Sequence, residues 1–295
     1  MSSEQVVSKN YPLYVGIITL IGSMISISLG NSYAKGLFHE LGAQGTTFYR
    51  LLFSAILLWI AWRPWRFSLS FTQFKLIVAY GVSLGLLNLF FYLALQTIPL
   101  GIAVAIEFCG PLGLALFSSR RKIDFLWIAL VAAGLLFLIP NGLTGTDSLD
   151  TMGLIYISTA AVLWAIYIII GQKMNGIHPG QASAFGISIS TLTVLPFATL
   201  DLGLVDLWHP ELLWMGFIVG LLSSAIPYSL EMIALRSLDR KTFGVLLSLE
   251  PAFSTIVGAF ILHEYLTLQQ IVAIMCIIIA SMGCTLTAKG KKSRK

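Results

Sequence analysis

Residues 100–118 read Leu100-Gly-Ile-Ala-Val-Ala-Ile-Glu-Phe-Cys-Gly-Pro-Leu-Gly-Leu-Ala-Leu-Phe-Ser118, with Glu107 as the one charged side chain. An apolar run of about 20 residues is what an α-helix needs to cross a bilayer. The whole chain has this character, since 57% of its 295 residues are hydrophobic and 11% are charged. Soluble domains are about 45–50% apolar and about 25% charged. We therefore expect an integral membrane protein, and exclude a soluble enzyme, a disordered chain and a nucleic-acid-binding module.

Ten apolar runs of this kind follow one another along the chain. None shows the alternation of polar and apolar residues that marks a membrane-spanning strand, so helices are the expected spanning element. The connections are short, and Cys109, Cys276 and Cys284 lie inside the runs as expected packing residues. The expected spans are 12–34, 42–62, 74–96, 100–118, 123–140, 152–172, 181–200, 212–235, 241–262 and 267–287.

The charges indicate how the spans are oriented. With the N-terminus in the cytoplasm, 16 of the 18 Lys and Arg residues fall in cytoplasmic loops and tails. This is the positive-inside pattern, and it also accounts for the sequence pI near 9.1. Lys35 is the one basic residue among the outer segments, which otherwise carry acidic residues. The basic tail 288–295 is expected to be cytoplasmic and to lie near anionic lipid.

The two halves of the chain resemble each other at an offset of 140 residues. Pro111 then falls on Pro251, and the pair Ile123-Asp124 falls on His263-Glu264. We expect two five-helix units, 12–140 and 152–287. Because five is odd, the second unit enters the membrane from the opposite side. Inverted repeats of this kind are typical of secondary transporters, whose substrate site lies near the midplane between the halves.

Four charged side chains remain inside the expected spans, where a charge is costly and often marks a pathway or a partner. They are Arg50, Glu107, Glu231 and Glu250. Each acid is a candidate for substrate binding or proton coupling; the alternative is a carboxyl hydrogen-bonded between helices. Glu231 has the further alternative of extending toward the loop at Arg236. Arg50 offers a planar donor fork for a substrate carboxylate, the alternative being a structural pair with a buried acid.

Each of these acids lies beside a proline. Pro111 follows Glu107 by four residues, so its ring opposes the Glu107 carbonyl and removes that carbonyl's donor. Pro227 and Pro251 lie beside the other two acids. We expect helix breaks at the three prolines that expose polar backbone. The polar and aromatic candidates for cavity walls are Asn88, Tyr92, Trp164, Tyr167 and Tyr228.

Motifs for catalysis are missing from usable positions. The four histidines lie in connections, and no zinc-protease, P-loop or dinucleotide-binding motif is suitably placed. The stretch Gly81-x-Ser-x-Gly85 lies in mid-span and is read as helix packing rather than as a nucleophile turn. We expect a protein that is not an enzyme, with no metal and no cofactor.

Several stretches resemble the threonine/homoserine exporters of the drug/metabolite transporter superfamily, which contain two EamA-type repeats. The stretches are Tyr80–Leu84, Pro99–Leu112, Leu116–Arg121, Trp164–Ile168, Pro227–Leu235, Glu250-Pro251 and Ala280–Leu286. The resemblance implies ten helices, a bacterial inner-membrane location and proton-driven efflux of small neutral amino acids. It leaves the substrate open, because nearby families export aromatic amino acids, cysteine-pathway metabolites or drugs.

Three other functions stay open from the residues alone. One is export of other metabolites, a second is a facilitative pore or uniporter, and a third is an integral-membrane scaffold or enzyme, which the missing catalytic motifs disfavour. The chain is expected to work as a monomer or a homodimer, since glycine pairs serve contacts within or between chains. We expect the substrate cavity between the halves, lined by spans one, three, four, six, eight and nine. Spans five and ten are expected to lie outside it as support.

Overall fold

The computed structural model confirms an all-helical chain. It describes residues 12–66, 69–117, 123–138, 149–174, 177, 179–203, 210–238, 243 and 246–287, and these contain helices and connections but no strand. Within them, six helical segments are long and apolar enough to cross a membrane, and four more apolar helices are shorter. The basic tail 288–295 lies outside the described residues.

Helices of the first half follow the expected spans closely. They are α1 (Leu13–Gly36), α2 (Phe38–Trp62), α3 (Phe71–Leu95), α4 (Leu100–Phe117) and α5 (Asp124–Leu138), with the short 3₁₀ helix η1 (Pro64–Arg66) after α2. Gly42, with φ 62°, kinks α2 near its start. A positive φ of this kind is readily accessible to glycine, so this residue type permits the sharp entry into α2.

The second half is less regular. Its helices are α6 (Thr151–Gln172), α7 (Pro179–Leu202), α8 (Pro210–Gly220), the π-helix η3 (Leu221–Ala225), α9 (Ile226–Ser237), α11 (Glu250–Ile261) and α12 (Leu268–Thr287). The expected single span 212–235 is therefore divided by η3. The expected span 241–262 is also interrupted, because a turn at 248–249 precedes α11, which begins at Glu250.

The prolines explain part of this difference between the halves. Pro251 occupies the first turn of α11, and Pro227 occupies the first turn of α9. Proline is suited to these positions because the first N–H groups of a helix have no intrahelical partner. Pro111 instead lies inside α4, which continues to Phe117. The break expected at Pro111 is therefore wrong.

Local capping fixes several helix starts. The hydroxyl of Ser70 accepts from the backbone N–H of Gln73, whose side chain accepts in turn from the N–H of Ser70, at 3.3 and 2.9 Å. This is a reciprocal capping box at the start of α3. The Asp150 carboxylate accepts from the N–H of Gly153 at 2.7 Å and caps α6. These polar residues end the apolar runs and set where the helices begin.

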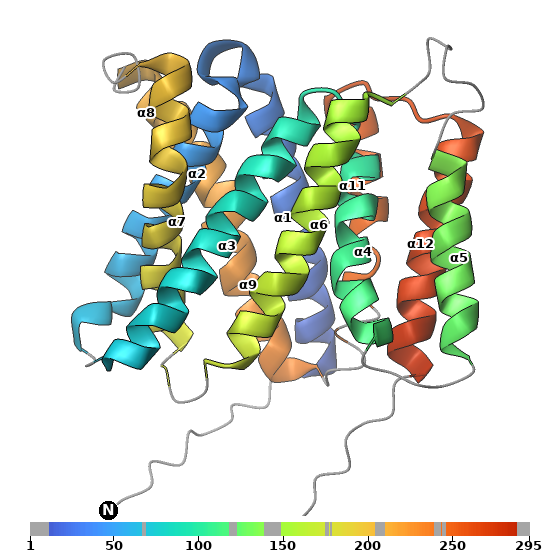
Figure 1. Ribbon diagram of the computed structural model, residues 1–295, viewed down its shortest axis with the longest axis horizontal. Helices are drawn as coiled ribbons and strands as arrows, with labels where there is room; N and C mark the ends of the chain where they lie inside the picture. The colour runs from blue at the N-terminus through green and yellow to red at the C-terminus, as the bar shows by residue number, and fades with distance from the viewer. Residues whose placement is uncertain are drawn as a thin grey trace, which may run out of the picture.

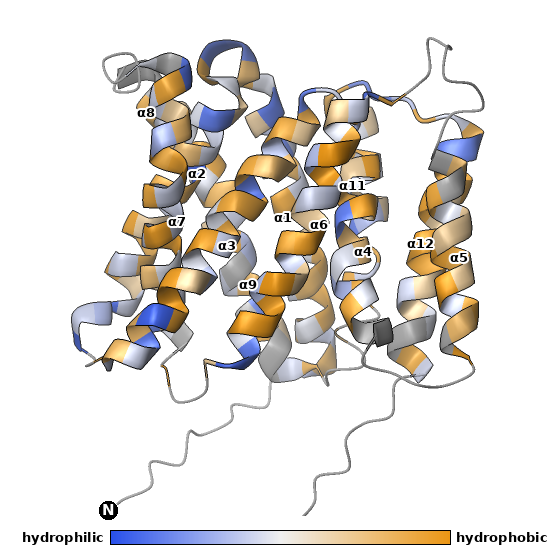
Figure 2. Cartoon of the chain, viewed as in Figure 1, coloured by the Kyte–Doolittle hydropathy of each residue, from blue (hydrophilic) through white to orange (hydrophobic). Residues whose placement is uncertain are grey.

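The helices stand side by side, most of them roughly along one direction (Figure 1). α5 and α12 pack against each other at one edge of the molecule, while α2, α7 and α8 form the opposite edge. Between these edges lie α1, α3, α4, α6, α9 and α11. Apolar residues cover most of the length of the helices, and polar residues are concentrated toward their ends (Figure 2). This distribution suits a protein whose sides face lipid.

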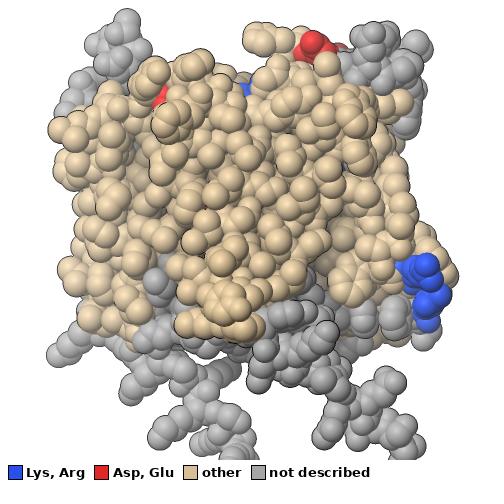
Figure 3. All heavy atoms as spheres, turned by 180° about the vertical axis from the view of Figure 1, so that it is seen from behind, with Lys and Arg blue, Asp and Glu red and all other residues tan. Residues whose placement is uncertain are grey.

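Charged residues separate between the two ends of the bundle (Figure 3). We call the end at which α2 and α6 begin the acidic end; its described charges include Glu40, Asp150, Asp201 and Glu264. We call the other the basic end; its described charges are Arg63, Arg66, Lys75 and Lys173. Lys35, at the last turn of α1, is the described basic residue on the acidic end.

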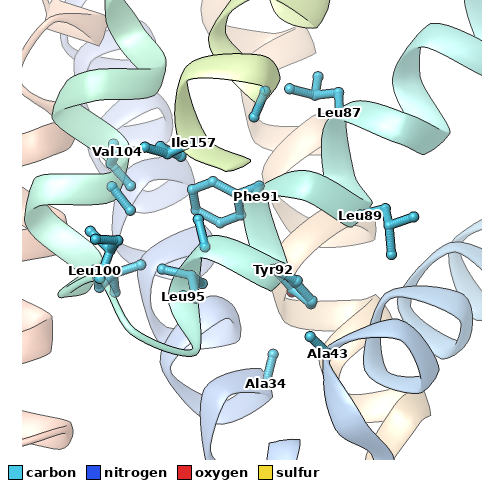
Figure 4. Packing of buried hydrophobic residues seen from close by; sticks show 14 of the residues in the cluster. Ala34, Ala43, Leu87, Leu89, Phe91, Tyr92, Leu95, Leu100, Val104 and Ile157 are labelled. Atoms are coloured by element: carbon cyan, nitrogen blue, oxygen red, sulfur yellow. The ribbon is translucent and has the colours of Figure 1, made fainter. Parts of the chain in front are cut away.

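A large apolar core joins the central helices. Phe91, Tyr92 and Leu95 of α3 lie in it beside Val104 of α4 and Ile157 of α6 (Figure 4). Burying a large apolar side chain of this kind in a soluble protein stabilises it by about 1.5–3 kcal/mol, but lipid removes much of that gain. Close van der Waals packing and buried polar contacts therefore have a larger share in holding these helices together.

Candidate substrate and coupling site

Small polar residues on α1 connect it to the second half of the chain. Ser23 donates to the Glu231 carboxylate at 2.9 Å, and Ser26 donates to the Leu222 carbonyl at 2.7 Å. Gly30 lies so close to η3 that an added Cβ would come within 2.6 Å of the Ser223 backbone nitrogen. Absence of a side chain at this position thus lets α1 approach the π-helix.

Arg50 lies buried in the middle of α2, with 5% of its surface exposed. Its Nε donates to the Ser224 hydroxyl at 3.3 Å, and its two terminal nitrogens donate to the Asn31 side chain at 3.3 Å and to the Ser223 carbonyl at 3.1 Å. The guanidinium also stands 5.3 Å from the ring centre of Tyr92. Among the described residues Arg50 forms no ion pair. The structure therefore does not show the alternative in which Arg50 forms a structural ion pair with a buried acid.

The π-helix η3 makes this arrangement possible. A π-helical turn inserts an extra residue and shifts the backbone hydrogen-bond register, and such turns are frequent at functional sites. Here the Leu222 carbonyl accepts from Ser26, and the Ser223 carbonyl accepts from Arg50. Both carbonyls point toward the first half of the chain. The irregular backbone is thus covered by protein, as membrane-embedded backbone requires.

Glu107 and Glu250 lie close enough for their charges to act on each other, and the Arg50 charge acts on both. They come from α4 and α11, which pack together. Glu250 occupies the first turn of α11, where the helix dipole favours a negative charge. Glu107 lies in the interior of α4 and has no helix terminus beside it. The structure therefore brings two predicted acids and the predicted arginine into one charged cluster.

Glu231 lies on the side of this cluster toward the basic end. Besides the bond from Ser23, its charge acts on Glu250 and on Tyr167, whose hydroxyl is 2.6 Å from that of Tyr80. The Arg236 side chain lies outside the described residues, so the alternative of a contact between Arg236 and Glu231 is not addressed.

The predicted wall residues divide into two groups. Tyr92 belongs to the Arg50 environment, because its hydroxyl donates to Asn31 at 3.2 Å. Asn88 donates to the Leu84 carbonyl of its own helix at 2.8 Å, and Trp164 packs edge-on against Phe108 of α4 with ring centres 5.4 Å apart. The side chain of Tyr228 lies outside the described residues.

The sequence did not single out several polar residues that complete the site. They are Ser28, Asn31, Ser223, Ser224 and Ser254, all buried. On α1, Ser28, Asn31 and Lys35 are spaced by three and four residues, which places them on one helix face. This periodicity could have indicated them from the sequence.

A second polar cluster lies at the acidic end. Lys35 forms an ion pair with Glu264 at 2.5 Å and donates to the Ile98 carbonyl at 3.3 Å. Glu264 also accepts from the N–H of Leu100, the first residue of α4, at 2.8 Å. The one basic residue expected among the outer segments thus has an acidic partner from the other half.

Comparisons with known proteins agree with this architecture. Residues 151–286 match the EamA-like transporter family. The chain is 44% identical over 287 residues to the threonine/homoserine exporter RhtA of Escherichia coli K12, with 97% of each chain covered. It is 43% identical over 282 residues to the RhtA protein of Salmonella typhimurium LT2, with 96% of this chain and 95% of that one covered. One solved crystal structure has the same fold, with a TM-score of 0.56, 17% identity, and 92% and 96% of the two chains covered.

The family match and the relatives together make this multi-pass helical membrane protein a transporter rather than an enzyme. The chain belongs to the EamA-like transporter family, and its similarity to the RhtA proteins extends over nearly its whole length. The resemblance found in the sequence is thereby confirmed.

Proposed function

We propose that this chain exports small neutral amino acids, with threonine and homoserine among them, in exchange for protons. The observation that carries the proposal is the charged cluster: a buried Arg50 held by neutral partners, with Glu107 and Glu250 within electrostatic reach. A zwitterion has the complementary charges. The relatives that match nearly the whole chain are named threonine/homoserine exporters.

The substrate carboxylate binds to Arg50. Within the described part of the chain, Asn31, Ser223 and Ser224 engage three of the five N–H groups of its guanidinium, which leaves two for a ligand. Because these partners are neutral, the positive charge is still available to an anionic group. A charge-assisted bond of this type contributes about 1.5–3 kcal/mol.

The substrate ammonium binds to Glu107, with Glu250 contributing to the negative potential. The same Glu107 carboxyl takes up the exchanged proton. A single carboxyl binds the ammonium or the proton but not both, so occupancy by one drives out the other. This competition couples outward flux of amino acid to inward flux of protons without a second ion site.

Alternation between inward-open and outward-open states rests on two inverted five-helix repeats, 12–140 and 152–287, giving ten spans. The helix contacts support this arrangement. In the proposed repeat, α1 corresponds to α6, α2 to α7, α3 to α8–α9, α4 to α11 and α5 to α12. The contact between α3 and α6 then corresponds to the contact between α1 and α9, and the contact between α4 and α6 to that between α1 and α11. The contacts α2–α7, α4–α11 and α5–α12 each join two corresponding helices. Two halves related in this way give the two open states similar energies.

The basic end faces the cytoplasm of a bacterial inner membrane, with both termini on that side. The segregation of Lys and Arg from Asp and Glu supports this orientation. With it, Glu264 and Lys35 lie at the outer surface, and Glu231 lies on the cytoplasmic side of the charged cluster.

Reconstituted proteoliposomes test the proposal. An interior more acidic than the medium should drive uptake of labelled threonine, because outward proton flow is exchanged for inward amino-acid flow. Uptake should be small without the gradient and absent in protein-free vesicles. Equal uptake with and without the gradient would indicate a uniporter, and no uptake of any amino acid would overturn the proposed function.

A further inference from the structure

Two serine hydroxyls meet between α1 and α11, beside the charged cluster. The Oγ atoms of Ser28 and Ser254 are 3.0 Å apart, and these residues are 0% and 1% exposed. Ser28 also donates to the Met24 carbonyl of its own helix at 2.8 Å. A hydroxyl has one hydrogen, and since that of Ser28 is given to Met24, we take Ser254 as the donor within the pair.

This hydrogen-bond pattern leaves acceptor capacity at Ser254. Its hydroxyl gives its hydrogen to Ser28 and accepts from none of the described residues, which leaves both lone pairs of its Oγ atom unused. A buried hydroxyl oxygen of this kind can accept a hydrogen bond from a ligand, either from a hydroxyl or from an ammonium group. The residues around the serine pair indicate which of these two ligand groups reaches Ser254.

The serine pair lies close in sequence to Glu250, which adds to the negative potential for the substrate ammonium, and to Asn31, which binds the carboxylate partner Arg50. Ser254 follows Glu250 by four residues on α11, and Ser28 precedes Asn31, a partner of Arg50, by three residues on α1. Each of these separations is about one helical turn, or about 5.4 Å along the axis. When the substrate ammonium is bound to Glu107 and its carboxylate to Arg50, a side-chain hydroxyl close to both groups is therefore expected to reach the serine pair.

We propose that Ser28 and Ser254 form the side-chain subsite of the transporter, which selects hydroxy amino acids by accepting a hydrogen bond from the substrate hydroxyl at Ser254. This inference rests on the proposed function, because it assumes an amino-acid substrate bound through Arg50 and Glu107. An analogue with a methyl group in place of the hydroxyl leaves a buried acceptor without a donor. Sites built to bond a hydroxyl discriminate against such analogues for this reason.

The test compares threonine with valine, which has nearly the same shape and lacks the hydroxyl. Proteoliposomes loaded with unlabelled threonine take up labelled threonine by exchange, and unlabelled threonine or valine competes for that uptake. The wild-type protein should favour threonine. Ser254→Ala should reduce the ratio of the two apparent affinities by about fivefold to tenfold, through weaker threonine binding. Ser254→Cys, which nearly preserves the volume, should shift the ratio in the same direction.

Ser26→Ala is the matched control on α1. Ser26 bonds to the Leu222 carbonyl and not to Ser254, so this change should lower the overall rate, if anything, and leave the threonine-to-valine ratio unaltered. Equal losses for threonine and valine in Ser254→Ala and Ser254→Cys would overturn the subsite, because they would assign the pair to the ammonium or to helix packing. A wild-type protein that exchanges both amino acids equally well would also overturn it. Absence of all amino-acid exchange would instead remove the proposed function itself.

Discussion

α4 and α11 correspond to each other in the sequence repeat, yet they carry their carboxylates differently. Pro111 and Pro251 align at the offset of 140 residues, but the acids do not. The position matching Glu107 is Leu247, and the position matching Glu250 is Gly110. Gly110 packs so closely on the Ala161 carbonyl of α6 that a Cβ there would collide with it. A carboxylate is thus excluded from that place in the first half.

The different positions of Glu107 and Glu250 along their helices give the two acids different electrostatic environments near Arg50. Glu250 begins a helix, whose positive end favours a negative charge there in addition to the Arg50 charge that acts on both acids. Glu107 lies inside a continuous helix and depends on Arg50 or on a ligand for compensation. We therefore propose that Glu107 exchanges the proton and the ammonium, and that Glu250 supplies a standing negative charge.

The largest expected effect is that of Glu107→Gln. Glutamine keeps the size and the hydrogen-bonding capacity of glutamate but cannot titrate, so folding should survive while proton-driven threonine uptake falls to the level of protein-free vesicles. The measurement is uptake under an imposed pH gradient, with size-exclusion chromatography as the control for folding. If well-folded Glu107→Gln protein concentrates threonine as the wild type does, the role given to Glu107 is wrong.

Arg50→Lys should produce the second-largest effect. Lysine keeps one positive charge but loses the planar fork, so the apparent affinity for threonine should fall by about 10- to 100-fold. Threonine amide lacks the carboxylate, and its weaker competition should change little in this variant. A similar loss for threonine and its amide would show that Arg50 supports the fold rather than the carboxylate.

Glu250→Gln should impair transport without abolishing it. The variant loses a charge that adds to the negative potential but does not itself exchange the proton. We expect about a fivefold lower rate, equivalent to about 1 kcal/mol, the size of a short-range charge interaction in a hydrated setting. A defect as complete as that of Glu107→Gln would erase the distinction drawn between α4 and α11.

How far the sequence predicts the fold depends on which forces decide each element. Apolar runs such as 12–34 locate helices well, because hydropathy alone decides them in a membrane. The division of 212–235 by η3 was beyond reach, since it depends on donors from α1 and α2, Ser26 and Arg50, that meet its carbonyls. Pro111 lies inside a continuous helix, whereas Pro251 lies at the start of one, because packing on other helices decides whether a helix continues past a proline.

The site was predictable only where charge marked it. Glu107, Glu250 and Arg50 stand out because charges are rare in apolar runs. Single serines such as Ser28 and Ser254 do not, since serine is frequent in membrane helices and 226 residues separate these two in the sequence. The pairing of Lys35 with Glu264 likewise needed the fold, although the isolated position of Lys35 on an acidic surface was a usable signal.

Both helices of the comparison meet at Glu264, which offers a test of how they are joined. Its carboxylate caps the start of α4 at Leu100, and its backbone N–H donates to Gly258 near the end of α11 at 3.2 Å. Lys35 and Glu264 are 21% and 15% exposed, so their ion pair should contribute about 1 kcal/mol. Glu264→Gln should therefore lower the thermal unfolding midpoint by a few degrees.

A double-mutant cycle with Lys35→Met should recover a coupling of about 1 kcal/mol between the two side chains. The exposed Glu40, on the same end, provides the control, and Glu40→Gln should leave the midpoint within error of the wild type. Strictly additive effects of the Lys35 and Glu264 changes would contradict the structural ion pair.

Glu231→Gln should have the smallest effect on transport. The Glu231 carboxylate accepts a hydrogen bond from Ser23, and a glutamine amide oxygen accepts the same bond, so the contact between α9 and α1 survives the change. What is lost is a charge that acts on Glu250 from the basic side of the cluster. We expect a reduction of about twofold in pH-gradient-driven threonine uptake, within the range set by exchanging a charged for a neutral acceptor.

Ser23→Ala removes the bond but keeps the charge, so comparing the two variants separates packing from electrostatics. If Glu231→Gln abolishes gradient-driven uptake while Glu107→Gln retains it, the proton is carried on α9 rather than on α4. The contrast between α4 and α11 would then describe substrate binding alone.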